Sequence, residues 1–184
     1  MHKKAYVLLA EGFELIEAMG PVDVLKRAGT EVVLVAVGTP TLEVESAQKV
    51  KVIANKKFDL DELKDADVLI LPGGYPGYVN LKNNPSVVKL TSYYIEHGKY
   101  LAAICGAPSL LGENKLIPGK KFTCHTSVVD FMDRDLYEKT GVVVDGKLIT
   151  SSGAGHAIEF GFAIANKFYD AEKLKAVKEG MELA

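Results

Sequence analysis

The stretch 100-YLAAICGAP-108 is the part of this chain from which its fold is best predicted. Five residues of apolar, strand-like sequence lead directly into Cys105, Gly106, Ala107 and Pro108. Proline suits the first turn of a helix, where no backbone donor is lost, and Gly106 allows a sharp reversal of the chain. We therefore expect a buried strand that turns into a helix at Cys105, the geometry of a nucleophile elbow with a thiol in place of the usual serine.

Strand-like and helix-like patterns alternate on both sides of this stretch. The expected strands are Lys4–Ala10, Glu31–Val37, Val68–Leu71, Tyr100–Ile104 and Lys147–Thr150, with a shorter one at Phe122–Cys124. The expected helices are Leu15–Ala28, Pro85–His97, Ala107–Lys115, Gly155–Lys167 and a last one from Ala171. Several strands are apolar on both faces, which is typical of central parallel strands covered by helices. The sequence predicts an α/β fold with a doubly wound, flavodoxin-like, mostly parallel sheet, helices on both faces, and a small edge hairpin within Val44–Ile53.

Composition indicates an ordinary globular protein. The chain has 184 residues, of which 48% are apolar and 25% charged, and its 22 basic residues nearly balance its 24 acidic ones. No basic stripe indicates nucleic-acid binding, and no linker or repeat divides the chain, so we expect one domain over residues 1–184. The apolar run Ala5–Ala10 is too short for a signal peptide or a membrane span. A cytoplasmic protein without a membrane partner is expected.

Two cysteines, Cys105 and Cys124, are too few for a disulfide scaffold, so both are expected to be free thiols in a reducing cytosol. At the start of a helix, free N–H groups and the positive dipole end favour the thiolate of Cys105. The alternative is that Cys105 is a buried cysteine packed as a small apolar residue. Cys124 is expected to be such a core residue.

Other reactive or ligand-binding residue types also follow predicted strands, where open α/β sheets bind ligands. Gly73 and Gly74 come directly after a strand and can expose backbone N–H groups as an oxyanion hole, although such a turn is often only a turn. A metal site is not expected, because adjacent Cys124 and His125 in or beside a strand point to opposite faces. No nucleotide-binding loop occurs, so no cofactor is expected.

The chain resembles the ThiJ/PfpI superfamily of class I glutamine amidotransferase-like domains over nearly its whole length. The resemblance rests on the cysteine motif Ala102–Pro108, the loop Leu69–Gly74, the segment Glu17–Gly29, and the glycine-containing loop Thr150–Gly155. It is greatest to the branch that contains protein deglycases and glutathione-independent glyoxalases. Gly106 departs from the protease-like branch, which has a histidine there, so the Cys-His pairing of a peptidase is missing.

The resemblance implies roles for further residues. Glu17 is expected beside Cys105, sharing a proton with its sulfur, because burial and a nearby negative charge raise the pKa of a carboxyl group. Without the resemblance, Glu17 is as easily a solvated helix residue. His125 is expected near the cysteine as a proton shuttle, with a structural histidine as the alternative. Asp23 and Arg27 are expected at a dimer contact or simply on the helix surface.

The late glycine-containing loop departs from the pattern of the branch. Ala154 stands where the branch often has proline, and His156 has no counterpart in the pattern. Both are candidates for the pocket or for a dimer contact.

The resemblance implies a cofactor-independent, homodimeric enzyme that converts methylglyoxal to lactate. It also suggests action on early glycation adducts of protein side chains, so the expected partners are small reactive aldehydes or glycated residues. In this hypothesis Cys105 attacks the aldehyde, Gly74 and Gly106 hold the oxyanion, and Glu17 and His125 move protons. The alternative is a redox sensor or chaperone-type stress protein, in which Cys105 is oxidised reversibly without turnover.

Overall fold

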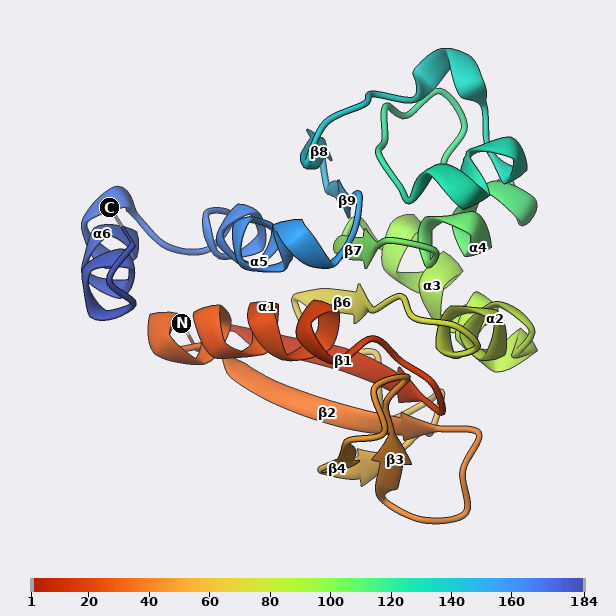
Figure 1. The fold of residues 1–184 in the computed structure, drawn as a ribbon, viewed down its shortest axis with the longest axis horizontal. Coiled ribbons are helices and arrows are strands. Elements are labelled where there is room, and N and C mark those ends of the chain that lie inside the picture. Colours follow the sequence, from red (N-terminus) through yellow and green to blue (C-terminus); the bar gives the residue numbers. More distant parts are fainter. Residues whose placement is uncertain (1, 184) are drawn as a thin grey trace.

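A seven-stranded sheet forms the centre of the molecule in the computed structural model, which describes residues 2–183 (Figure 1). The strands of this sheet, in chain order, are β1 (Lys4–Ala10), β2 (Glu31–Val37), β5 (Lys56–Lys57), β6 (Val68–Leu71), β7 (Tyr100–Ile104), β8 (Val142–Asp145) and β9 (Leu148–Ser151). Their spatial order is β5-β2-β1-β6-β7-β9-β8. All neighbouring pairs are parallel except β8 and β9. The mostly parallel α/β sheet predicted from the sequence is confirmed.

Helices cover both faces of this sheet. They are α1 (Leu15–Ala28), α2 (Gly77–Lys82), α3 (Pro85–Glu96), α4 (Pro108–Glu113), α5 (Ala157–Ala165) and α6 (Ala171–Gly180). Alternate residues of β1 divide the core, as the two-residue period of a strand requires. Val7 and Leu9 belong to the cluster that includes side chains of α1, α5 and α6, whereas Tyr6 and Leu8 belong to the cluster with α2, α3 and α4. A strand buried on both faces explains why its sequence is continuously apolar.

Helices α1 and α5 pack directly against each other (Figure 1). A Cβ atom on Gly161 of α5 would lie 2.9 Å from the Cα of Pro21 and 3.1 Å from the Cβ of Val24, both in α1. Only glycine fits so close an approach without a shift of the backbone. This packing holds α1 against one face of the sheet and so helps to fix the position of Glu17, which lies in the first turn of the helix.

The structure also corrects several expected elements. The segment Phe122–Cys124 is not a strand, because only a single bridge, from Phe122 to Tyr137, joins it to another segment. Strands β5 and β8 and helix α2 were not expected; they have only two, four and six residues. The other predicted bounds differ by only one or two residues. The edge hairpin is confirmed as β3 (Glu43–Glu45) paired with β4 (Lys51–Ile53), apart from the main sheet.

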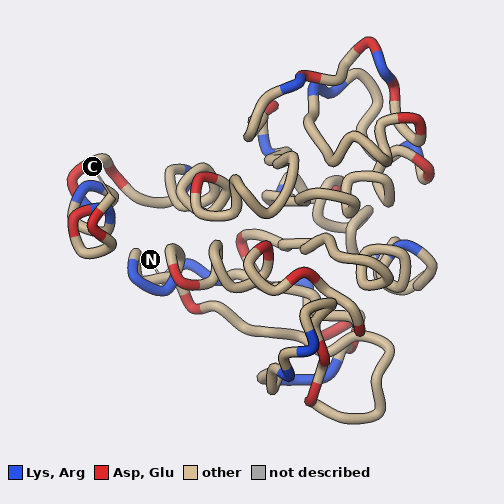
Figure 2. Tube along the Cα trace, viewed as in Figure 1, with Lys and Arg blue, Asp and Glu red and all other residues tan. Residues whose placement is uncertain are grey.

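Charged residues of both signs are interspersed along the chain, as the tube in Figure 2 shows. Most of the ion pairs are short-range or solvent-exposed, such as Arg27 with Asp23 at 2.9 Å, and such pairs stabilise a fold little. Within residues 2–183, none of the helices is long and apolar enough to cross a membrane.

Candidate functional site

Cys105 lies at a sharp turn between β7 and α4. Its φ angle is 63°, in the left-handed region that residues other than glycine rarely adopt. The backbone on both sides is held in place: its N–H donates to the carbonyl of Ser151 at 2.9 Å, and its carbonyl accepts from the N–H of His125 at 2.9 Å. A strained backbone conformation that is held by hydrogen bonds on both sides, between a strand and a helix, is the geometry of a nucleophile elbow. The half-buried thiol is free, as predicted.

The glycine loop after β6 approaches this elbow closely. A Cβ atom on Gly73 would lie 2.5 Å from Oε2 of Glu17, 2.6 Å from the Cβ of Cys105 and 3.1 Å from its Sγ. The loop therefore brings three predicted site residues into van der Waals contact, and any larger residue at position 73 would separate them. On the other side, the Tyr78 ring packs on Gly106, where a Cβ atom would lie 2.6 Å from Cδ1 of the ring.

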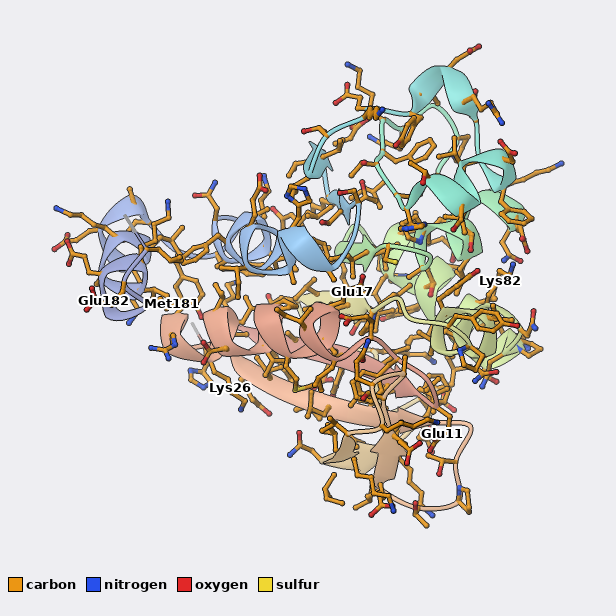
Figure 3. The ribbon with its side chains drawn as sticks, viewed as in Figure 1. Glu11, Glu17, Lys26, Lys82, Met181 and Glu182 are labelled. Carbon is orange, nitrogen blue, oxygen red and sulfur yellow. The ribbon has the colours of Figure 1, made fainter. Side chains whose placement is uncertain are left out.

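Glu17 is buried at the start of α1, with only 1% of its surface exposed (Figure 3). The Gly73 N–H donates to its Oε2 atom at 3.0 Å. Its own N–H donates to the side chain of Glu14 at 2.8 Å, which caps the helix. Burial is the main reason why the pKa of Glu17 is raised to about 7, and the charge of Glu14 adds to it. Hydrogen bonds from Cys105 and from the Gly73 and Ala154 N–H groups act in the opposite direction. The predicted position of Glu17 beside the cysteine is therefore found in the structure.

The electrostatics of Cys105 differ from the expectation of a lowered pKa. Burial and then the neighbouring Glu17 raise the pKa of the thiol to about 12, although the Gly74 and Gly106 N–H groups lower it. Helix α4 has only six residues, so its dipole does little to offset burial. Both groups resist ionisation chiefly because burial disfavours their charged forms, and the charge of Glu17 further raises the pKa of the thiol. Above about pH 7 the pair keeps one proton, which sulfur and carboxyl share.

Four backbone N–H groups near the site form two pairs, according to the side chain with which each interacts. Those of Gly74 and Gly106 interact with the sulfur, whereas those of Gly73 and Ala154 interact with the Glu17 carboxyl. Gly74 and Gly106 therefore lie at the sulfur, while the Gly73 N–H donates to the carboxyl group instead. A role of these glycines in an oxyanion hole stays a prediction. Ala154 lies at the site, where its N–H interacts with the Glu17 carboxyl; a part of Ala154 in a dimer contact stays a prediction.

His125 and His156 line one open groove of about 520 Å³, together with Lys139, Thr140 and Ser152. The His125 backbone contacts Cys105, but its imidazole Nδ1 lies 2.8 Å from Oγ of Ser127 and accepts from the Ser127 N–H at 3.3 Å. The imidazole thus caps the turn Thr126–Phe131. Nδ1 of His156 lies 3.0 Å from Oε2 of Glu159. A proton-transfer role for His125 stays a prediction.

The remaining candidates lie apart from the cysteine. Asp23 and Arg27 form an exposed pair on α1, and Arg27 also donates to the carbonyl of Gly180 at 3.3 Å. Cys124 is fully buried. In the described part of the chain, no three histidine, cysteine, aspartate or glutamate side chains are grouped as a metal site. Sequence reasoning missed Ser151 and Tyr78, which hold the elbow through long-range contacts that leave no local signal in the sequence.

A family model described as the DJ-1/PfpI family matches residues 3–167. The chain belongs to this family. Protein DJ-1 homolog B of Arabidopsis thaliana is 38% identical over 168 residues, which cover 91% of this chain but only 38% of that protein. This chain therefore spans less than half of the length of that relative.

Other relatives of the family match along their whole length. Glutathione-independent glyoxalase DJR-1.2 of Caenorhabditis elegans is 31% identical over 185 residues, covering 99% of this chain and 97% of that protein. The crystal structure of Drosophila melanogaster DJ-1beta superposes with a TM-score of 0.91 at 32% identity and full coverage of both chains. The predicted superfamily is confirmed.

Because Cys105 and Glu17 lie side by side, we expect the rate of alkylation of Cys105 to depend on the ionisation of Glu17. We expect iodoacetamide to label Cys105 faster as the pH rises through about 7, where Glu17 loses its proton and becomes a base that can take the proton of the neighbouring thiol. Cys124 should react far more slowly throughout, because it is fully buried whereas the Cys105 thiol is only half-buried and has Glu17 beside it. Peptide mass spectrometry between pH 5 and pH 9 measures both rates. Equal rates for the two cysteines would contradict the assignment of Cys105 as the reactive thiol.

Proposed function

We propose that this chain is a single-domain, cofactor-independent enzyme that converts α-oxoaldehydes such as methylglyoxal to hydroxy acids such as lactate. The supporting observation is the meeting of Cys105, Glu17 and the Gly73–Gly74 loop within van der Waals distance. A nucleophile, an acid–base group and backbone N–H donors at one point are the parts that carbonyl addition and proton transfer require. The relative whose name describes a glutathione-independent glyoxalase supports the same reaction.

The first step is addition of sulfur to the aldehyde carbon. With the shared proton on Glu17, the Cys105 thiolate forms the S–C bond and the carbonyl π electrons move to oxygen. The Gly74 and Gly106 N–H groups, which interact with the sulfur in the free protein, are placed to donate to this oxyanion. Glu17 then gives up its proton, and the product is a neutral hemithioacetal. Donors placed beforehand cost no reorganisation during the reaction.

The next steps move hydrogen without any net redox change. The Glu17 carboxylate takes the proton from the former aldehyde carbon and forms an enediol, and the neighbouring carbon is then protonated. The result is a thioester of lactate with Cys105. Water hydrolyses this ester, releasing lactate and restoring the thiol. The sum is methylglyoxal plus water giving lactic acid, so no external oxidant or cofactor enters. His125 is proposed as a helper for the carbon-to-carbon proton transfer.

The open groove beside Cys105 also supports a wider range of substrates. His125 and Ser152 lie in its wall. The His125 N–H donates to the Cys105 carbonyl, and Ser152 follows Ser151, whose carbonyl accepts from the Cys105 N–H. We include early glycation adducts of protein side chains among the proposed substrates, because an open groove admits a side chain that is attached to a larger molecule.

A homodimer is part of the same proposal. Ile16 on α1 and Val50 and Ile53 at the edge hairpin are 47%, 43% and 63% exposed. The two elements lie together, since the N–H of Leu15 donates to the side chain of Gln48 at 3.0 Å. Apolar residues grouped on a surface favour association with another protein surface. Participation of Asp23 and Arg27 in the dimer contact stays a prediction.

Turnover of methylglyoxal by the purified protein tests the proposed function. We expect consumption of methylglyoxal and formation of an equal amount of lactate without added glutathione or metal, measured by coupled lactate assay and proton NMR. Protein inactivated with iodoacetamide is the control. Absence of lactate from active-site-titrated, reduced protein would overturn the proposal. Selective peroxide oxidation of Cys105 in such a protein would favour a redox sensor.

A further inference from the structure

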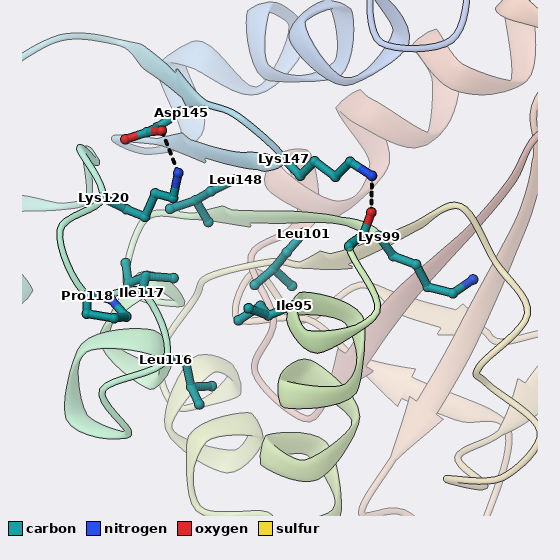
Figure 4. A pocket seen from close by; sticks show the side chains of 11 residues that line it. Ile95, Lys99, Leu101, Leu116, Ile117, Pro118, Lys120, Asp145, Lys147 and Leu148 are labelled. Carbon is teal, nitrogen blue, oxygen red and sulfur yellow. Dashed lines mark hydrogen bonds and ion pairs between the residues drawn. The ribbon is translucent and has the colours of Figure 1, made fainter.

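A cavity of about 390 Å³ lies at the amino ends of β7 and β9, whereas Cys105 lies just beyond the carboxyl end of β7. Leu101 and Leu148 form its floor at the starts of the two strands. Ile95 at the end of α3, and Leu116 and Ile117 after α4, form its walls (Figure 4). The cavity is therefore separate from the candidate functional site, and no residue of the proposed reaction lines it.

The walls of this cavity are apolar and incompletely covered. Leu101 and Leu148 are buried, but Ile95, Leu116 and Ile117 are only half-buried, and Figure 4 shows these side chains gathered around one space. The volume is within the range of about 300–1,000 Å³ that is usual for small-molecule sites. At about 30 Å³ for each water-sized group, it has room for about a dozen non-hydrogen atoms. An apolar chain of moderate length fits this space.

The charges at the cavity are predominantly positive. Lys99, Lys120 and Lys147 line it, and Asp145 is its one acidic residue. Both oxygens of Asp145 are occupied, one by the Lys120 ammonium at 2.9 Å and the other by the Lys121 N–H at 3.0 Å. Lys99 and Lys147 instead donate to the backbone carbonyls of Ala66 and Gly98, which are neutral acceptors. Two lysine charges at the cavity thus remain without compensation by an acidic side chain among the described residues that line it.

The two lysines differ in their relation to the apolar space. The ammonium group of Lys99 points away from the cavity, so its aliphatic stem alone contributes to the wall (Figure 4). Lys147 is exposed on the turn between β8 and β9, and its ammonium donates to the Gly98 carbonyl, a neutral acceptor. Lys120 lies at the other side of the opening. Because Lys120 is paired with Asp145, a carboxylate at the opening interacts with the Lys147 ammonium while its chain fills the apolar interior.

We propose that this cavity binds a medium-chain carboxylate, with the chain against Leu101, Ile117 and Leu148 and the carboxylate at Lys147. The two parts of the site match the two parts of such a molecule. A neutral chain leaves the positive charge uncompensated, and a cationic chain is repelled by it. This ligand does not react at Cys105, so the proposal is independent of the proposed function.

Calorimetric titration with sodium octanoate tests this proposal, with octan-1-ol and octylammonium chloride as neutral and cationic probes. We expect one saturable octanoate site with a Kd on the order of 0.1–1 mM, as suits about ten non-hydrogen atoms. Octanol should bind at least tenfold more weakly, and octylammonium should not bind. Amide chemical shifts should change at Leu101, Ile117 and Leu148, and not at Cys105.

Charge-reversal variants decide whether Lys147 contributes to octanoate binding. Lys147→Glu should weaken octanoate binding about tenfold or more, since it replaces attraction by repulsion. Lys89→Glu makes the same charge change at an exposed position of α3 outside the cavity and should leave the Kd unchanged. Unchanged thermal melting of both variants excludes unfolding as the cause. No saturable octanoate binding, equal binding of octylammonium, equal effects of the two variants, or shift changes confined to the Cys105 side would each overturn the proposal.

Discussion

Replacing Cys105 with alanine is expected to abolish methylglyoxal consumption, with a loss of at least about 10³-fold in kcat/KM. The loss is large because the proposed reaction passes through two covalent species on this sulfur, and removal of a nucleophile leaves only binding and the oxyanion donors. No other thiol can replace it, since Cys124 is fully buried and the pKa of its thiol is raised by burial. Initial rates of lactate formation under reducing conditions measure the effect.

Two further variants separate chemistry from folding. Cys124→Ala removes the other thiol and should retain most of the activity, despite the small cavity that it leaves in the core. Cys105→Gly also removes the nucleophile, but it relieves the strain of a φ angle of 63°, so it should be inactive and at least as stable as Cys105→Ala. Activity of Cys105→Ala above a few per cent of wild type would show that sulfur is not the nucleophile.

The sequence predicted the parts of the fold in which local pattern and tertiary burial agree. Central strands such as Val68–Leu71 are buried throughout, so their apolar composition identifies them. Strand β5 has two residues and is paired only with β2, and its Lys-Lys sequence has no apolar signal. Strand β8 is an edge strand that alternates in burial and pairs antiparallel with β9. The two strands are joined by the turn at Gly146. An antiparallel edge hairpin of this kind lacks the continuous apolar pattern by which the central parallel strands were predicted.

The positions of the site residues could be predicted from the sequence better than their pKa values could. The strand-to-helix turn at Cys105 and the glycines after β6 were visible because both follow buried strands. The place of Glu17 needed the family resemblance, because three glutamates, Glu11, Glu14 and Glu17, occur close together in the sequence. The third is selected by tertiary contacts, which bury its carboxyl against Gly73, Cys105 and Ala154. The raised pKa of Cys105 was missed, since burial of the sulfur beside Glu17 is a long-range property that outweighs the local effect of a helix start.

Replacing Glu17 with glutamine is expected to lower kcat by about 10²-fold or more, the usual scale of general acid–base catalysis. Glutamine keeps the size of the side chain and can still accept from the Gly73 N–H, but it cannot give up or take a proton. Glu14→Gln is the matched control: it makes the same change three residues earlier, and its amide oxygen can still accept from the Glu17 N–H and so cap α1. We expect only a small change in kcat for this control. Full activity of Glu17→Gln beside an inactive Cys105→Ala would contradict the role of Glu17 in proton transfer.

The same substitution should raise stability at alkaline pH, which distinguishes lost chemistry from damaged folding. The pKa of Glu17 is raised from 4.5 to about 7 in the folded chain, so the folded state binds the proton more tightly than the unfolded state. Its contribution to stability is complete below about pH 4.5 and is lost as the pH rises through about 7. Glutamine never ionises, so the difference in unfolding free energy between Glu17→Gln and wild type should grow by about 2 kcal/mol in favour of the variant between pH 5 and pH 8, since one pKa unit corresponds to about 1.4 kcal/mol. Urea unfolding at the two pH values measures it. A difference that does not change with pH would show that the buried carboxyl does not hold the shared proton, and the proposed proton path would then fail even if the variant were inactive.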